Sequence, residues 1–138
     1  MIKRLFNPEP LSHKKGIAVI RIICGALVIY HGQEIFHQDI MDFYLSWKVF
    51  SVPSGKFMVY FGKTVELTSG LLLLFGMFTR LGSILLMGAM LFITFKVGEG
   101  RFWYEEQHPF LFALIALSFF FSGPGAWSVD QLLFRKKE

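Results

Sequence analysis

Two pairs of ionisable residues in this sequence have the types and spacing to exchange protons or hold a polar ligand. His31 is followed at i+3 by Glu34, and Lys63 is followed at i+3 by Glu66. Residues three apart lie on one face of a helix, so each pair would form one polar patch. Both patches fall within apolar segments, where an ionisable group costs roughly 2.5–3.5 kcal/mol and usually faces a partner. They are therefore the leading candidates for chemistry.

The two patches are expected at similar depths in a membrane. Counting about 1.5 Å of rise per residue from the outer helix ends, His31 and Lys63 come to the same level, and Glu66 lies about one turn deeper. Glu34 and Tyr60 come out shallower. We therefore predict that both patches line one polar pocket in the outer half of the bilayer.

A third pair extends this predicted pocket. His108 follows Glu105 at the same i+3 spacing, just before the last apolar segment and so at the outer mouth. We assign proton exchange, the catalytic role, to His31 and Glu66. The predicted ligand-binding residues are Glu34, Tyr60, Lys63 and His108.

Three interpretations of the pocket stay open. The polar residues could join helices without any ligand, as interhelical polar contacts do in membrane bundles. They could instead bind a quinone, a lipid or another amphiphile, with His31 and Glu66 exchanging protons. The third interpretation is a metal or haem site, because Glu-x-x-His spacing occurs in bundle carboxylate centres. Lys63 would repel a cation there and the full ligand set is missing, so we assign no metal ligand.

Four apolar segments must position these residues, at about 16–36, 57–78, 81–97 and 109–122. A membrane-spanning helix needs about 20 mostly apolar residues. The segment 81–97 has no charge before Lys96, whereas a helix of a soluble bundle would show a polar stripe every three to four residues. We therefore predict a single all-α domain over residues 1–138, a polytopic membrane four-helix bundle.

Composition agrees with a membrane protein and excludes other classes. The 138 residues are 54% hydrophobic and 17% charged, whereas soluble domains average about 25% charged residues. The single cysteine, Cys24, excludes an intrachain disulfide and a thiolate metal cluster. The net charge of +4 lies at the chain ends rather than in a stripe, so we expect no nucleic-acid partner.

The basic residues predict the orientation of the chain. One side of the predicted bundle would hold Lys3, Arg4, Lys14, Lys15, Arg80, Arg135, Lys136 and Lys137. The other side would hold Lys48, Lys56, Lys96 and Arg101. The positive-inside rule then favours cytoplasmic N- and C-termini. Arg21 interrupts the first segment and no small-residue cleavage site follows it, so we interpret that segment as a mature helix rather than a signal peptide.

Three further features are interpreted as structural. The aromatic stretch between His37 and Lys56 predicts a short interfacial segment between the first two spans. Arg21 is close enough to the inner end of its span to reach the cytoplasmic headgroups. Asp130 lies in the first turn of a short helix, Val129–Phe134, and could pair with Arg80 across the inner face.

Five short motifs, in this order and spacing, resemble the DoxX family of small four-span bacterial membrane proteins. The motifs are Ile20-Arg21-Ile22-Ile23-x-Gly25, His31-Gly32, Glu66-x-x-x-Gly70, Gly76-x-x-Thr79-Arg80 and Gly123-Pro124-Gly125-x-x-Ser128-x-Asp130. The resemblance covers roughly residues 16–133. It implies a four-helix membrane bundle, often associated with oxidoreductases or quinol oxidases, and related DoxD-type chains are linked to thiosulfate:quinone oxidation. The candidate functional residues that the resemblance implies in this sequence are His31, Glu66, Arg80 and Asp130.

One departure from the family pattern concerns the predicted pocket. The family usually has a lysine shortly after the His-Gly pair, where Gln33 and Glu34 stand in this sequence. Lys63 in the second span supplies a positive charge instead, so the charge of the pocket could be kept in balance from another helix.

Together these features predict a multi-pass protein of the bacterial inner membrane. We expect a subunit or accessory of a membrane redox system, at most an oxidoreductase subunit, with a pocket for a quinone-like molecule or another amphiphile. Membrane lipid is the expected partner, and a redox partner subunit or a second copy of the chain is left open. The alternative is a non-catalytic scaffold, or a small-molecule or lipid-binding protein without a redox role.

Overall fold

The computed structural model describes residues 12–134, and every regular element in that range is helical. The α-helices are α2 (His13–Gly32), α3 (Gln38–Leu45), α4 (Gly55–Phe75), α5 (Thr79–Phe92), α6 (Gln107–Ser122) and α7 (Val129–Phe134). Two 3-10 turns, η1 (Gln33–Phe36) and η2 (Lys48–Phe50), follow α2 and α3, and a π-helical segment, η3 (Ile93–Val97), extends α5. The all-α prediction is confirmed for these residues. Five of the basic residues used to predict the orientation lie outside the described range: Lys3, Arg4, Arg135, Lys136 and Lys137.

Three helical segments are long and apolar enough to cross a membrane: His13–Phe36, Gly55–Phe75 and Thr79–Val97. The apolar helix α6 has 16 residues, or about 24 Å at 1.5 Å per residue, against a hydrocarbon core of about 30 Å. Large apolar side chains stay exposed on the outer faces of these helices, among them Ile23, Phe61 and Leu111. Such a surface suits lipid rather than water, and together with the three long helices it indicates a membrane protein.

Five predicted span boundaries shift by two or three residues, and two of these shifts have an identifiable reason. The second span was predicted to reach Phe78, but α4 ends at Phe75 because Gly76 adopts a left-handed conformation with φ 62°. A three-residue link follows, Gly76 to Phe78, and turns the chain directly into α5, so that α4 and α5 form an antiparallel hairpin. The last helix begins at Gln107 rather than at Pro109. Proline is tolerated there because backbone N–H groups of the first helical turn have no intrahelical acceptor.

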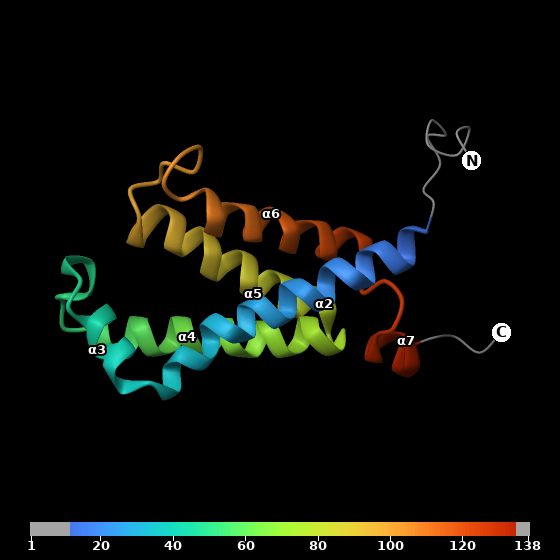
Figure 1. Cartoon of the computed structure of the whole chain (residues 1–138), viewed down its shortest axis with the longest axis horizontal. Coiled ribbons are helices and arrows are strands. Elements are labelled where there is room, and N and C mark those ends of the chain that lie inside the picture. The colour runs from blue at the N-terminus through green and yellow to red at the C-terminus, as the bar shows by residue number, and fades with distance from the viewer. Residues whose placement is uncertain (1–11, 135–138) are drawn as a thin grey trace.

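The long helices pack in the sequence α2 on α4, α4 on α5 and α5 on α6 (Figure 1). Glycines allow α2 and α4 to approach closely. A Cβ added at Gly25 would lie 2.5 Å from the backbone nitrogen of Leu74, and one added at Gly32 would lie 2.5 Å from that of Leu67. Small residues at a crossing bring backbones together in this way in membrane bundles. The close approach places the end of α2 beside the middle of α4.

The buried apolar core lies among α2, α4, α5 and α6. Its members are Cys24, Val28, Leu73, Leu86, Met90, Ala113, Ala116 and Phe119. Together with the small side chains that face them, these residues fix the rotation of each helix about its axis. The polar residues of α2 and α4 are thereby turned toward one another rather than toward the surrounding solvent or lipid.

Arg21 lies in the interior of the protein and not on its surface, so its side chain does not extend outward as the sequence suggested. Its side chain is 0% exposed. The guanidinium donates hydrogen bonds to the carbonyl oxygens of Leu73 and Leu74 at the end of α4. It also donates to Pro124 at 2.8 Å and to Trp127 at 2.9 Å in the segment after α6, with a longer bond to Ala126. A cation at a helix C-terminus satisfies carbonyls that have no intrahelical donor, and this one also ties the C-terminal segment to the bundle.

The predicted helix Val129–Phe134 is present as α7, at the same end of the molecule as the start of α2 (Figure 1). The predicted pair between Asp130 and Arg80 is wrong. The Asp130 carboxylate instead accepts hydrogen bonds from the backbone N–H groups of Phe78, at 2.6 Å, and Thr79, at 2.9 Å. These amides open α5 and need acceptors, so Asp130 serves as a cap from a distant segment.

Candidate functional site

The ammonium group of Lys63 is the centre of a polar cluster between α2 and α4. Its Nζ lies 2.7 Å from Oε2 of Glu34 and 3.0 Å from Oε2 of Glu66. It also donates a longer hydrogen bond, 3.4 Å, to the carbonyl oxygen of His31. Because Glu66 is only 5% exposed, this cluster is largely shielded from solvent, and burial of two carboxylates requires a nearby cation.

Tyr44 joins the cluster from α3. Its hydroxyl donates a 2.7 Å hydrogen bond to Oε2 of Glu34, the same oxygen that Lys63 contacts. The ammonium of Lys63 lies 4.7 Å from the centre of the Tyr44 ring, within the range of a cation–π interaction. Burial, and then the hydrogen bond to Glu34, raise the pKa of the Tyr44 phenol, since both favour its neutral form.

Helix α3 is placed by its own packing. The short helix predicted between His37 and Lys56 is present as Gln38–Leu45, and its Met41 is fully buried against the bundle. Trp47 and Phe50 continue the aromatic face on which Tyr44 lies, with Tyr44 and Trp47 rings 5.1 Å apart. The segment therefore folds back over the first half of α4 and covers the polar cluster.

His31 and His108 meet at the edge of this cluster. Their ring centres are 6.1 Å apart in an edge-to-face arrangement. Nδ1 of His31 lies 3.8 Å from Oε1 of Glu34, and the His31 side chain is 46% exposed. The His108 ring also packs edge-on against Phe112, 5.0 Å between centres. The two imidazoles thus bring two titratable groups from α2 and α6 next to the buried carboxylates.

A cavity of about 230 Å³ opens beside these groups. Its polar lining residues are His31, Tyr44, Lys63, Glu66 and His108. Its apolar and aromatic lining is larger and includes Val28, Trp47, Phe50, Met58, Val59, Met90, Phe92, Ile93, Val97 and Phe112. An apolar hollow with a few convergent polar groups is the usual form of a small-molecule site.

The wall contributed by α5 is not a regular helix. Residues Ile93–Val97 form a π-helical turn, and both Ile93 and Val97 line the cavity. The side chain of Thr94 is fully buried and donates to the carbonyl oxygen of Met90. Single π-turns inside α-helices are rare and occur often at functional sites, so this wall is a further indication that the cavity is a binding site.

The structure brings together most of the residues chosen from the sequence. His31, Lys63, Glu66 and His108 line the cavity, and Glu34 lies behind them, bonded to Lys63 and Tyr44. Tyr60 does not line it, and its ring lies 5.9 Å from the ammonium of Lys56 instead. Glu105 pairs with Arg101 on the surface. The structural residues Arg21, Arg80 and Asp130 belong to the opposite end of the bundle.

Tyr44 is the residue that sequence reasoning missed. It was assigned to the interfacial aromatic stretch, and its only available signal was its place on the same helical face as Trp47. That signal predicts a buried face but does not show that α3 folds over α4 with the hydroxyl directed at Glu34.

The cluster contains more acidic groups than basic groups. Two carboxylates, Glu34 and Glu66, share the single ammonium of Lys63. With both carboxylates ionised the three groups sum to −1, and with one protonated they sum to zero. His31, whose side chain is 46% exposed, lies at the edge of this cluster. Within residues 12–134, no group of three His, Cys, Asp or Glu side chains is arranged to hold a metal ion.

Comparison with known proteins gives one family and two relatives. The DoxX family profile matches residues 16–99. An "Uncharacterized protein" of Haemophilus influenzae is 28% identical over 127 residues, which cover 87% of this chain and 92% of the relative. A Bacillus subtilis protein with the name "Putative oxidoreductase CatD" is 26% identical over 133 residues, covering 92% of this chain and 93% of the relative. No solved structure matches the chain significantly.

Proposed function

This chain belongs to the DoxX family, whose profile spans more than half of its residues, and on that premise we propose that it is a subunit or accessory of a membrane redox system. The cavity beside Lys63 and Glu66 is the proposed site for a quinone-like molecule. The observation that supports this most directly is the apolar cavity edged by a polar cluster of two carboxylates and one ammonium group. The oxidoreductase name of the Bacillus subtilis relative agrees with this proposal.

We also propose four spans with both termini in the cytoplasm of a bacterial inner membrane. Helix α6 would be the fourth span, lengthened at the interface by Phe102, Trp103 and Tyr104. Aromatic side chains of this kind favour the headgroup level. The excess of basic residues at the chain ends supports the orientation. With this orientation the cavity would lie in the outer half of the bilayer, at the end of the bundle opposite α7 and the start of α2.

The cavity suits the head of a quinone better than a whole quinone. Typical sites for drug-sized ligands enclose about 300–1,000 Å³, and this one has about 230 Å³. A planar ring would lie among Trp47, Phe50 and Phe112, with its carbonyl oxygens toward the polar edge. An isoprenoid tail would leave between helices into the lipid.

The proposed role of the chain is to supply protons. Reducing a quinone to a quinol takes two electrons and two protons, and the electrons would come from a redox partner. Glu66 and His31 line the cavity and would each give one proton to a quinone oxygen. Lys63 stays bound to Glu34 and Glu66, so its part is to balance their charge while Glu66 gains and loses its proton.

Binding of a short-tailed ubiquinone analogue to the purified protein tests this proposal. Glu66→Leu keeps approximately the size of the side chain and removes the carboxyl group that would donate to a quinone oxygen. A hydrogen bond between uncharged groups is worth about 0.5–1.5 kcal/mol, so we expect affinity to fall about twofold to tenfold. Glu99→Leu is the matched control, because Glu99 is exposed and does not line the cavity. Unchanged affinity in a folded Glu66→Leu protein would refute the proposal.

The alternative is a scaffold in which the cluster only joins helices. It is favoured by one observation: Lys63 is saturated by Glu34, Glu66, the His31 carbonyl and the Tyr44 ring, all within the protein. A scaffold predicts that Glu66→Gln and His31→Ala lower the unfolding temperature, while the wild-type protein shows no measurable affinity for the quinone analogue. Saturable binding by the wild type that weakens in Glu66→Leu and not in Glu99→Leu would exclude it.

A further inference from the structure

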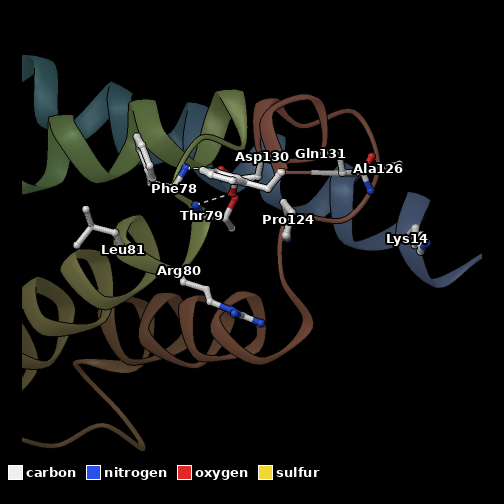
Figure 2. Close-up of a pocket in the computed structure, with 10 residues that line it drawn as sticks. Lys14, Phe78, Thr79, Arg80, Leu81, Pro124, Ala126, Asp130 and Gln131 are labelled. Atoms are coloured by element: carbon white, nitrogen blue, oxygen red, sulfur yellow. Dashed lines mark hydrogen bonds between the residues drawn. The ribbon is translucent and has the colours of Figure 1, made fainter. Parts of the chain in front are cut away.

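A second hollow lies at the opposite end of the bundle, where α2 begins and where α7 lies. It has a volume of about 740 Å³ and is bordered by the start of α2, the turn between α4 and α5, and the C-terminal segment (Figure 2). Its lining includes Lys14, Phe78, Thr79, Arg80, Asp130 and Phe134. We call it the terminal groove. The terminal groove is separate from the cavity proposed for the quinone-like molecule.

The terminal groove has two exposed cations and one carboxylate that is already engaged. Lys14 and Arg80 form no ion pair or side-chain hydrogen bond with any residue in 12–134. Asp130 is held by the backbone N–H groups of Phe78 and Thr79, and Figure 2 shows the Arg80 side chain turned away from it. The groove therefore keeps an excess of positive charge, which favours an anionic ligand.

The Thr79 hydroxyl is a second polar feature of this site. The side chain is 1% exposed, and its Oγ1 has no hydrogen-bond partner in the described structure. A buried hydroxyl normally has a partner. Thr79 belongs to the lining of the groove, so a ligand that shifts the adjacent side chains slightly would give this hydroxyl an acceptor.

The walls of the terminal groove are apolar. Phe78 and Phe134 lie 6.3 Å apart between ring centres, and both are at least half exposed. Leu81 begins an exposed apolar face of α5 that continues to Ile84, one turn further along the helix. An occupant of the groove would thus meet positive charge at the end of the bundle and a hydrocarbon surface running away from it along α5.

We propose that the terminal groove binds an anionic phospholipid. Arg80 holds the phosphate, Lys14 adds positive potential, and an acyl chain lies along the face of α5 that Leu81 and Ile84 form. Arginine forms two parallel hydrogen bonds with a phosphate, and basic pockets between helices on the cytoplasmic side are suited to anionic headgroups. A free phosphate shares the headgroup chemistry but gains nothing from the apolar wall, so the structure favours the lipid.

Native mass spectrometry of the whole protein in an uncharged detergent tests this proposal. The probes are phosphatidylglycerol, phosphatidylcholine and inorganic phosphate. The double variant Lys14→Gln/Arg80→Gln is compared with Lys48→Gln/Lys56→Gln, which removes the same charge from exposed lysines away from the groove. A basic residue near an anionic headgroup is worth about 1 kcal/mol, so affinity for phosphatidylglycerol should fall about fivefold for Arg80→Gln alone and about thirtyfold for the double variant.

The outcomes separate the lipid from other occupants. Binding of phosphatidylglycerol that exceeds phosphatidylcholine, and that weakens in the groove variant but not in the control, supports the proposal. Equal binding by both double variants overturns it, and so does equal binding of the two lipids. Displacement of phosphatidylglycerol by millimolar inorganic phosphate would show a site for free phosphate and also overturn it. If the double variant fails to fold, Arg80→Gln alone tests the proposal: a fivefold loss of affinity for phosphatidylglycerol supports it, and unchanged affinity overturns it. Glu66 lies at the other end of the bundle, so the quinone test is independent of this one.

Discussion

The ammonium of Lys63 and the carboxylate of Glu34 lie 2.7 Å apart although the residues are 29 positions apart in the sequence. One belongs to α4 and the other to the turn that follows α2. Glu34 is thereby fixed in a position where its carboxylate also accepts a hydrogen bond from the hydroxyl of Tyr44 in α3. A single ion pair thus joins three segments at the mouth of the cavity, and its removal should affect all three.

Lys63→Met should destabilise the protein strongly. The variant keeps the length of the side chain but leaves Glu34 and Glu66 without their cation. Removing one partner of a buried ion pair typically costs about 3–5 kcal/mol, so we expect a clear fall in the unfolding temperature in detergent, followed by circular dichroism. The triple variant Glu34→Gln/Lys63→Met/Glu66→Gln should recover much of the loss, because neutral replacement of a whole buried cluster is often tolerated. A Lys63→Met protein as stable as the wild type would show that the cluster is not a buried ionic unit.

The phenol of Tyr44 should ionise at a higher pH than an ordinary tyrosine. The chain has four tyrosines, and the pKa of Tyr44 is raised by burial and by its bond to Glu34. Because the folded protein favours the neutral phenol, this contribution to stability is complete below the ordinary tyrosine pKa, about 10. It is lost as pH rises from there through the folded-state pKa. Titration of phenolate absorbance should show a late step that Tyr44→Phe removes and that Tyr104→Phe, a change at an exposed residue, leaves in place.

Local sequence patterns predict the helices and the two polar pairs, His31 with Glu34 and Lys63 with Glu66. Long apolar runs predict α2, α4 and α5, and i+3 spacing predicts that His31 and Glu34, or Lys63 and Glu66, share a helix face. Ser128 before Val129 is enough to predict α7, and its hydroxyl accepts from the N–H of Gln131. In each case the signal lies within a few residues of the feature that it predicts.

Features that depend on tertiary packing left no such signal. Arg21 binds backbone carbonyls of two distant segments, and every residue has a carbonyl, so no side-chain pattern identifies its partners. Asp130 likewise caps amides about fifty positions earlier in the chain. Tyr44 enters the site because α3 buries Met41 against the bundle. The opposite charges of Arg80 and Asp130 suggested an ion pair. In the structure the Asp130 carboxylate instead accepts hydrogen bonds from the backbone N–H groups of Phe78 and Thr79.

Arg21→Leu should loosen the C-terminal segment as well as the bundle. The substitution removes every bond from the guanidinium to Leu73, Leu74, Pro124, Ala126 and Trp127. Each hydrogen bond from a charged group is worth about 1.5–3 kcal/mol when measured singly, and since such bonds are not additive we expect a total loss of at least about 3 kcal/mol. Arg21→Lys keeps the charge without the planar fork and should lose less. Limited proteolysis after α6 should be faster in Arg21→Leu, and an unchanged cleavage rate would contradict this role.

Asp130→Ala should weaken the turn between α4 and α5. Phe78 is held with φ 48°, a left-handed conformation that L residues adopt reluctantly, and the Asp130 carboxylate accepts its N–H together with that of Thr79. Removal of a capping side chain costs about 0.5–2 kcal/mol. Asp130→Asn keeps one acceptor oxygen and should lose less, while Asp39→Ala, at an exposed residue of α3, should change little. Hydrogen exchange of the Phe78 and Thr79 amides is the direct measurement: exchange should accelerate in Asp130→Ala alone. Equal protection in the wild type and this variant would mean that the turn is stable without its cap, since a bond to Asp130 is the interaction that shields both amides.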